Sequence, residues 1–197
     1  DRYISILEKL NSMTQAPSII WFKRDLRIND HAALLEASHS NAPVIPLYII
    51  EPGYWKQPFA SRRHWHFIHD CLVDLNVALA NLGQPLVIRI GGACDVIKSL
   101  HLEHQIGAVY AHEETGNLWT YQRDIAVQNL CSNHAIELYE APSNGVVRRL
   151  SSRDDWSRIR NARMSEKILP KPISLSPLPS CKSDALPNKN DPMFGAI

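Results

Sequence analysis

The sequence is poor in the residues that cross-link a chain or form a glycine-rich phosphate-binding loop. Its four cysteines are far apart and form no Cys-x-x-Cys pair, which argues against a disulfide framework and against a zinc site. Neither G-x-G-x-x-G nor G-x-x-x-x-G-K-[ST] occurs, so standard dinucleotide and triphosphate sites are not expected. The pair Gly91-Gly92 is more typical of a tight turn than of a phosphate site.

Long apolar runs and an excess of one charge are also missing. No run approaches the roughly 20 apolar residues that cross a bilayer, and no signal-peptide pattern occurs. We therefore expect a cytoplasmic protein with no membrane partner. The 21 basic and 20 acidic residues give a net charge of +1, which is too balanced for a domain that binds DNA by broad phosphate neutralisation.

Short apolar segments alternate with helical patterns along most of the chain. The expected strands cover residues 18–22, 44–50, 86–90, 108–111 and 136–139. The expected helices cover residues 32–37, 61–82, 94–104 and 118–130, with Asp30 as the N-cap of the first and Gly83 ending the second. This order predicts an α/β fold, a doubly wound, Rossmann-like, three-layer αβα domain with a five-stranded parallel sheet.

Two details refine this prediction. Pro46 has no N–H for a ladder bond, which favours an edge position or a bulge for the strand over 44–50. The helix over 61–82 has one apolar stripe with alternating steps of three and four residues. The stripe consists of Trp65, Ile68, Leu72, Leu75, Leu79 and Leu82.

Composition divides the chain into four parts. Residues 1–16 are an N-terminal extension whose first twelve residues are either foreign to the gene or a genuine helix. Residues 17–149 form the α/β domain, and residues 150–169 form a helical connection. Residues 170–197 contain six of the 13 prolines, so we expect an extended linker that cannot form a core and that leads to an absent C-terminal domain.

In a doubly wound sheet, ligands bind at the carboxyl ends of the strands where the strand order reverses. The segments expected there are 23–27, 51–54, 91–93 and 112–117. Arg62 and Arg63 open the long helix, where the backbone N–H groups and the helix dipole favour an anion. No nucleophile set is recognisable, so we assign no catalytic residue, and the clustered histidines lack the carboxylates or thiolates of a metal site.

The segment from Trp21 to Leu34 (W-F-K-R-D-L-R-I-N-D-H-A-A-L) resembles the opening of the DNA photolyase/cryptochrome family, with Lys23 where many members carry Arg. Later segments resemble the family in the same order, and together the matches cover roughly residues 18–156. These segments are Pro46 with Glu51, Ser61 to Arg63, Arg123-Asp124, and Asn144 to Arg149 followed by Trp156.

The resemblance implies the N-terminal, light-harvesting domain of a deoxyribodipyrimidine photolyase. The full-length protein would be a monomeric carbon–carbon lyase that uses FAD, bound in a helical C-terminal domain, for blue-light repair of pyrimidine dimers in damaged DNA. The resemblance further implies that the full-length protein flips the damaged nucleotides out of the duplex, as photolyases do. The chain alone would then be inactive, with its own FAD-binding domain as its partner.

The resemblance also implies an antenna chromophore, which is a folate, a deazaflavin or FMN in family members. By segment, the cofactor-binding candidates are Arg24, Asp25, Arg62, Arg63, His112, Glu113 and Glu114. The alternative for the first turn is that Arg24, Asp25 and Arg27 form salt bridges to neighbouring loops or to the second domain. Glu113 and Glu114 are alternatively a solvated loop pair.

Two other functions remain open at this point. The first is the same domain of a cryptochrome photoreceptor, because the two classes differ in parts that lie outside these residues. The second is a stand-alone nucleotide-binding α/β module, against which the Pro-rich end argues.

Overall fold

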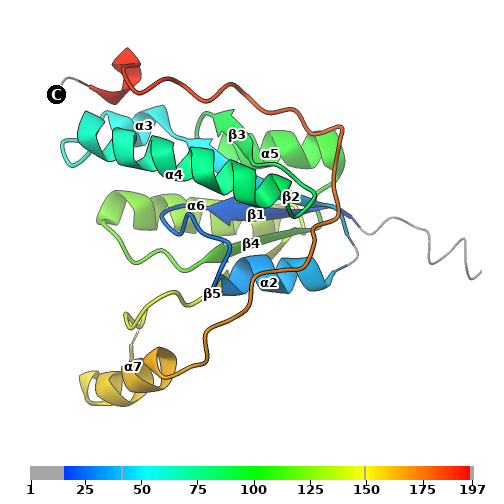
Figure 1. Cartoon of the computed structure of the whole chain (residues 1–197). Helices are drawn as coiled ribbons and strands as arrows, with labels where there is room; N and C mark the ends of the chain where they lie inside the picture. The colour runs from blue at the N-terminus through cyan, green and yellow to red at the C-terminus, as the bar shows by residue number, and fades with distance from the viewer. Residues whose placement is uncertain (1–15, 41, 149, 196–197) are drawn as a thin grey trace, which may run out of the picture.

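The computed structural model describes residues 16–195 except 41 and 149, so the predicted extension lies almost entirely outside the described residues. One sheet of five parallel strands forms its centre, in the order β3-β2-β1-β4-β5 (Figure 1). The strands are β1 (Ser18–Phe22), β2 (Val44–Ile50), β3 (Val87–Ile90), β4 (Ala108–His112) and β5 (Glu137–Ala141). The predicted fold class is confirmed.

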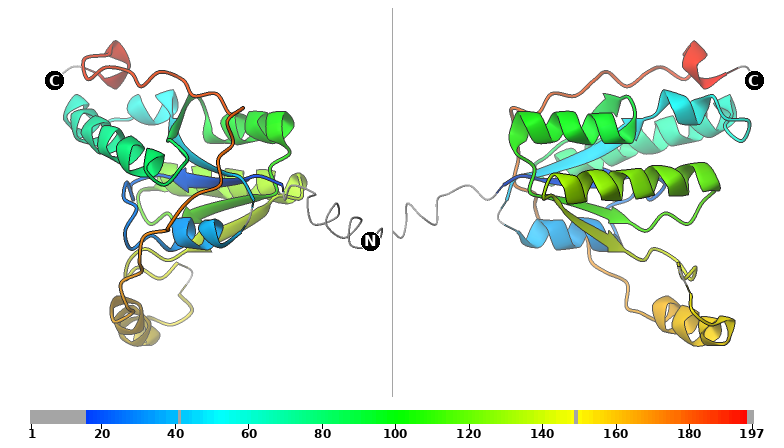
Figure 2. Two further views of the ribbon diagram at one scale, coloured as in Figure 1. Left: turned by 45° about the vertical axis from the view of Figure 1, so that its right-hand side comes forward. Right: turned by 180° about the vertical axis from the view of Figure 1, so that it is seen from behind.

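Helices cover both faces of the sheet, which completes the αβα layers (Figure 2). The helices are α2 (Ala32–His39), α3 (Pro52–Trp55), α4 (Arg62–Ala80), α5 (Ala93–His104), α6 (Leu118–Asn133) and α7 (Trp156–Met164). Alternation along β1 divides the core, because Ile20 and Phe22 pack with α2 and α4, whereas Ile19 and Trp21 pack with α5 and α6. No helix among the described residues is long and apolar enough to cross a membrane.

Helix α4 follows its predicted pattern. The Ser61 hydroxyl accepts a hydrogen bond from the His64 N–H and caps the helix. Trp65, Leu72, Leu75 and Leu79 are buried, while the opposite face is exposed. The helix ends at Ala80 with Asn81 as its C-cap, so the prediction that Gly83 ends it is wrong; Gly83, with a φ of 107°, instead closes the turn that follows the helix.

The prediction that Pro46 marks an edge or a bulge is wrong, because β2 lies between β1 and β3. Pro46 is opposite Ile20 of β1, and the ladder with β3 begins one residue later, at Leu47. We infer that the missing N–H therefore interrupts no bond to β3.

The expected N-cap at Asp30 is also wrong. His31 is the cap, since its Nδ1 accepts the Leu34 N–H at 3.0 Å. Asp30 has a φ of 50°, a conformation that Asp tolerates better than most residues. Its backbone N–H donates to the Leu169 carbonyl and its carboxylate accepts the Leu169 N–H, each at 3.1 Å, so Asp30 binds a distant segment and not the helix.

Residues 170–195, called here the C-terminal strap, correct the expectation that the Pro-rich tail cannot form a core. The strap has little regular structure beyond a 3-10 turn, Pro192–Phe194, but it runs along the sheet and over α4 (Figure 1). Leu175 and Phe194 are buried in the core, and the Phe194 ring stacks on Trp65 with ring centroids 3.8 Å apart. At the outer edge of β3, the Asp184 N–H donates to the Ile88 carbonyl at 2.8 Å.

Helix α7 lies apart from the sheet and buries none of its residues (Figure 2). It follows a short 3-10 turn, Arg153–Asp155, so the predicted helical connection is present but shorter than expected.

Candidate functional site at the carboxyl ends of the strands

The carboxyl ends of β1, β2 and β4 bring together residues from three loops. The order β3-β2-β1-β4-β5 places the reversal of strand order between β1 and β4, where doubly wound folds bind ligands. Two polar clusters lie there. The Asp–His–His cluster consists of Asp25, His31 and His112, and the ionic cluster consists of Lys23, Glu51, Glu114, Arg123 and Asp124.

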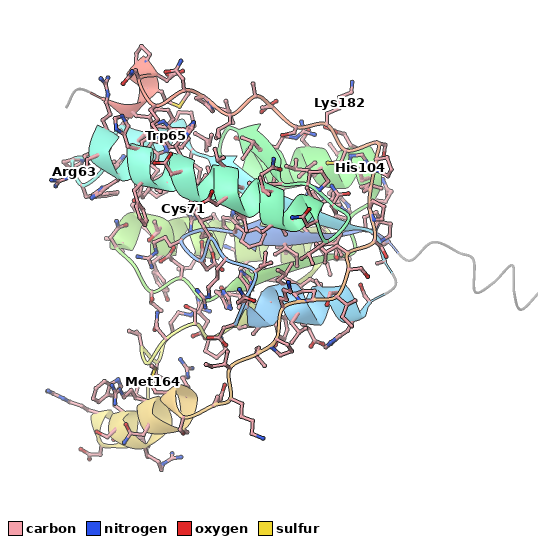
Figure 3. All side chains as sticks on the ribbon, in the orientation of Figure 1. Arg63, Trp65, Cys71, His104, Met164 and Lys182 are labelled. Atoms are coloured by element: carbon pink, nitrogen blue, oxygen red, sulfur yellow. The ribbon has the colours of Figure 1, made fainter. Side chains whose placement is uncertain are left out.

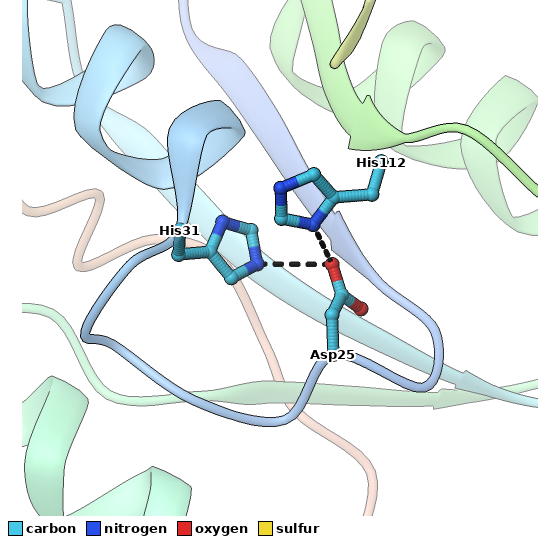
Figure 4. A group of neighbouring side chains, drawn as sticks. All are labelled: Asp25, His31 and His112. Atoms are coloured by element: carbon cyan, nitrogen blue, oxygen red, sulfur yellow. Dashed lines mark hydrogen bonds and ion pairs between the residues drawn. The ribbon is translucent and has the colours of Figure 1, made fainter. Parts of the chain in front are cut away.

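The Asp–His–His cluster is buried and connects the β1–α2 turn to the end of β4 (Figure 4). One oxygen of Asp25, Oδ2, lies 2.5 Å from His112 Nδ1 and 3.0 Å from His31 Nε2. The other oxygen accepts the Lys23 N–H at 2.8 Å. Burial alone would raise the pKa of Asp25, but the bonds from the two imidazoles hold it well below its usual range.

Three such donor atoms close together also match a metal-ligand set. The hydrogen bond at the opposite side of His31 argues against a metal here. His31 Nδ1 accepts the Leu34 N–H, so a neutral ring carries its proton on Nε2, the atom that would have to bind the metal. Burial lowers the pKa of His31, which favours this neutral form. We therefore describe the cluster as a hydrogen-bonded lock.

The ionic cluster surrounds Arg123, which lies one turn inside α6. Its guanidinium contacts Glu51 at 2.8 Å, Asp124 at 2.9 Å and Glu114 at 3.2 Å. Lys23 pairs with Asp124 at 2.7 Å, and both side chains are only 6% exposed. Trp21 lies beneath the cluster, 4.7 Å from the Lys23 ammonium and 4.8 Å from the guanidinium.

Burial affects the charges of this cluster unequally. Burial raises the pKa of Glu51 above its ordinary value despite its ion pair with Arg123. Burial opposes the charge on Arg123, yet Asp124 and Glu51 raise its pKa above the ordinary value. The cluster therefore holds a guanidinium firmly, whereas the charge on the Glu51 carboxylate depends on its cationic neighbour.

Two cavities adjoin the ionic cluster. The inner cavity has a volume of about 70 Å³ and is lined by residues that include Glu51, Tyr54 and Arg123. The outer cavity, of about 340 Å³, is lined by the loop from Glu114 to Leu118 together with Tyr121 and Arg148. The two cavities share Glu114 and Asn117, so they form one crevice at the switch point.

The structure separates the seven predicted cofactor-binding residues into four places. Only Arg24 and Glu114 line the crevice, where they form an ion pair of 2.5 Å. Asp25 and His112 belong to the buried lock, and Glu113 pairs with Arg148 and Arg163 at 3.6 and 3.5 Å.

Arg62 and Arg63 begin α4 and line none of the cavities described here. Figure 3 shows Arg63 pointing outward at the end of the helix. The alternative of salt bridges in the first turn is found for Arg24, which pairs with Glu114, whereas Asp25 contacts the imidazoles of His31 and His112. Arg27 instead donates to the backbone carbonyls of Asn29 and Asp30.

Lys23 lies in the segment 23–27 that the sequence placed at the ligand edge, but neither Lys23 nor Arg123 was among the predicted cofactor-binding residues. A signal for both exists, because charged residues that directly follow a buried strand, or that open a helix at the switch point, lie at the ligand edge of the sheet. Lys23 follows β1 directly, and Arg123 lies in the Arg123-Asp124 pair that carried part of the resemblance.

The comparisons with known proteins agree with this arrangement. A family model described as DNA photolyase matches residues 18–155. A cryptochrome DASH of Solanum lycopersicum is 30% identical over 135 residues, which cover 66% of this chain and 22% of that protein. A deoxyribodipyrimidine photo-lyase of Agrobacterium fabrum is 37% identical over 89 residues, which cover 45% of this chain and 18% of that protein.

Solved structures show the same fold. A bacterial class III photolyase from Agrobacterium tumefaciens superposes with a TM-score of 0.76 at 25% identity, over 91% of this chain and 40% of that one. A cryptochrome from Synechocystis has a TM-score of 0.72 at 18% identity, covers 89% of this chain and 40% of that one, and supports the fold alone. The chain spans only 22% and 18% of the two curated relatives. With the family model matching residues 18–155, the chain belongs to the DNA photolyase family, within its N-terminal α/β domain.

Proposed function

We propose that this chain is the light-harvesting domain of a DNA photolyase and that an antenna chromophore binds in the crevice beside the ionic cluster. The observation that carries the proposal is the crevice itself. It opens at the switch point of the sheet, where this fold class binds its ligands, and it joins charged, amide and aromatic side chains.

The size of the two cavities supports a position for the chromophore in the outer cavity. Ligand pockets commonly measure roughly 300–1,000 Å³, so the inner cavity of about 70 Å³ is too small for a flavin or a folate. The outer cavity of about 340 Å³ is large enough for the ring system of either. The chromophore would rest there and reach the inner cavity with one polar edge.

The residues of the crevice suit such a ring. Asn117 uses its side-chain oxygen to cap α6 through the Thr120 N–H, which leaves its amide N–H groups free to donate to ring carbonyls. Leu118 is 69% exposed at the rim and offers an apolar surface to a ring face. Glu114 would accept from ring N–H or ribityl O–H groups, while Arg24 and Arg123 balance its charge.

Family members bind FAD and an antenna chromophore, and the repair chemistry would come from the flavin of a C-terminal domain. The residues described here would hold and orient the antenna and exclude water from its inner edge. The chain alone would neither repair DNA nor bind FAD stoichiometrically.

Titration of the chain with methenyltetrahydrofolate, a deazaflavin and FMN, each monitored by fluorescence, tests the antenna site. We expect one of the three to bind and Leu118→Glu to weaken its binding by at least tenfold. The matched control is Leu102→Glu, because Leu102 is 66% exposed on α5 and lines none of the cavities described here. Equal loss in both variants, or binding of none of the three compounds, would contradict the proposed site.

Repair by a protein that contains this chain together with its C-terminal domain tests the enzymatic part. The 37% identity to a photo-lyase favours loss of pyrimidine dimers from irradiated DNA under blue light. The second candidate is a cryptochrome, which the longer match of 135 residues to a cryptochrome DASH favours. Flavin photoreduction without dimer repair would select that candidate.

A further inference from the structure

A third cavity lies between the sheet and α7 and shares no lining residue with the crevice. Its volume is about 220 Å³. Its lining comes from the β1–α2 turn, the end of β4, the segment after β5, and α7 with the residues that follow it. The charged and polar residues used below are Arg27, Asp30, His112, Arg163, Glu166 and Lys167.

His112 supplies a hydrogen-bond acceptor at the buried side of this cavity. The residue is only 4% exposed, and its Nδ1 lies against Asp25 Oδ2 (Figure 4). A neutral ring that donates from Nδ1 carries a lone pair on Nε2. Among the described residues, Nε2 has no hydrogen-bond partner, so a group that enters the cavity with an O–H or N–H can donate to it.

Three cationic side chains line the cavity. Arg27 donates through Nε and Nη2 to backbone carbonyls and forms no ion pair with a described carboxylate. Lys167 also has no ion-pair partner in the described part of the chain. Arg163 contacts the Val146 carbonyl at 2.6 Å and Glu113 at 3.5 Å. Cationic donors with unused N–H groups favour an oxyanion, phosphate above all.

Two carboxylates line the same cavity and disfavour a ligand that is only an anion. Asp30 has one oxygen bound to the Leu169 N–H, which leaves the other free to accept. Glu166 makes no hydrogen bond to a described residue through its side chain. Such carboxylates accept bonds from hydroxyl groups, so the lining suits a ligand that carries several hydroxyls beside its phosphate.

We propose that this cavity binds a small phosphorylated sugar, at a site separate from the antenna crevice. The phosphate lies among Arg27, Arg163 and Lys167, and the sugar hydroxyls donate to His112 Nε2 and to the carboxylates. A volume of about 220 Å³ is below the roughly 300 Å³ at which drug-sized ligands begin, which fits a pentose phosphate better than a nucleotide.

Calorimetric titration of the chain with ribose 5-phosphate tests the site. We expect Lys167→Gln to weaken binding about tenfold, the loss of one charge-assisted bond. Lys167 is exposed, so the variant keeps the fold, and Lys171→Gln is the matched control because Lys171 is exposed nearby and does not line the cavity. The ¹⁵N resonance of His112 Nε2 should shift on binding.

Inorganic phosphate, ribose and a short 5′-phosphorylated oligothymidylate are titrated in parallel. Weaker binding of all three than of ribose 5-phosphate supports the proposal. Equal binding of inorganic phosphate would overturn the hydroxyl contacts, and tighter binding of the oligonucleotide would assign the cavity to nucleic acid instead. No binding of ribose 5-phosphate at millimolar concentration, or equal losses in the two lysine variants, would also overturn it.

Discussion

The Asp–His–His cluster and the ionic cluster lie at the same edge of the sheet but are built on opposite principles. The first places one carboxylate between two imidazoles and a backbone N–H, with His31 neutral and buried. The second holds two cations and three carboxylates beside an open crevice. The Asp–His–His cluster therefore has a single arrangement of hydrogen bonds. In the ionic cluster, by contrast, a ligand group can replace one of the ion-pair partners.

This difference shows how the fold separates rigidity from binding. Asp25 connects the β1–α2 turn to β4, so the lock fixes the backbone from which Lys23 and Arg24 project. Arg123 and Glu114 then present charges at a position that the lock has set. Variants in the lock should therefore change stability, and variants in the ionic cluster should change stability less and ligand binding more.

The largest effect is expected for Asp25→Ala. It leaves the buried N–H donors of His112 and Lys23 without an acceptor, at about 1–3 kcal/mol each before relaxation, and it removes the carboxylate that lies 3.0 Å from His31 Nε2. We expect the free energy of unfolding to fall by about 3–5 kcal/mol in urea denaturation. Asp74→Ala on the exposed face of α4 is the control. A similar loss of stability in both variants would show that Asp25 does not stabilise the fold through the Asp–His–His cluster.

A smaller effect is expected for Arg123→Met, because Lys23 and Arg24 still compensate part of the negative charge. We expect a loss of about 2–3 kcal/mol at pH 8. Without the guanidinium the pKa of Glu51, already raised by burial, rises further. A carboxyl whose folded pKa lies above its unfolded value loses stability as the pH rises, so the deficit should be smaller at pH 5.

Denaturation of this variant at the two pH values, beside the unsubstituted chain, gives the comparison. A deficit that grows towards pH 5 would show that Glu51 is not the carboxylate that Arg123 compensates.

The stability of the unsubstituted chain should depend on pH through His31 of the Asp–His–His cluster. His31 has a folded pKa below its ordinary value of 6.5, so the unfolded state binds the proton more readily. Stability should therefore fall as the pH falls below 6.5, by at most about 1.4 kcal/mol per pH unit from this residue. His31→Asn keeps an N-cap acceptor for the Leu34 N–H and should flatten the curve between pH 6.5 and 5. An unchanged slope would assign the titration to another group.

The elements of the sheet could be predicted from the sequence because their signals are local. The run Ser18 to Phe22 and the stripe of α4 each specify an element by residues a few positions apart. The strand-end rule also placed Asp25 and His112 among the candidates, although it did not show that they contact each other across 87 positions.

Long-range packing could not be predicted in this way. The strap has a composition typical of a linker, yet Phe194 stacks on Trp65, and Asp184 pairs with the edge of β3. The two strap residues that are buried in the core, Leu175 and Phe194, lie far apart in the sequence and form no periodic pattern, so only the tertiary structure shows that the segment belongs to the core. The same holds for Asp30, whose N-cap role was plausible locally but whose carboxylate binds Leu169 instead.

The smallest effect on stability is expected for Arg24→Gln, which tests whether the ionic cluster serves ligand binding more than stability. The Arg24 side chain is 62% exposed, whereas its partner Glu114 is 2% exposed and also pairs with Arg123. Because the Arg24 side chain is exposed and Glu114 keeps its ion pair with Arg123, the free energy of unfolding should change by less than about 1 kcal/mol, as for a surface ion pair. Chromophore affinity should change more than stability, since Arg24 lines the crevice and pairs there with Glu114. A loss of stability as large as that of Arg123→Met, with unchanged chromophore binding, would show that the ionic cluster is a second lock and not a binding edge.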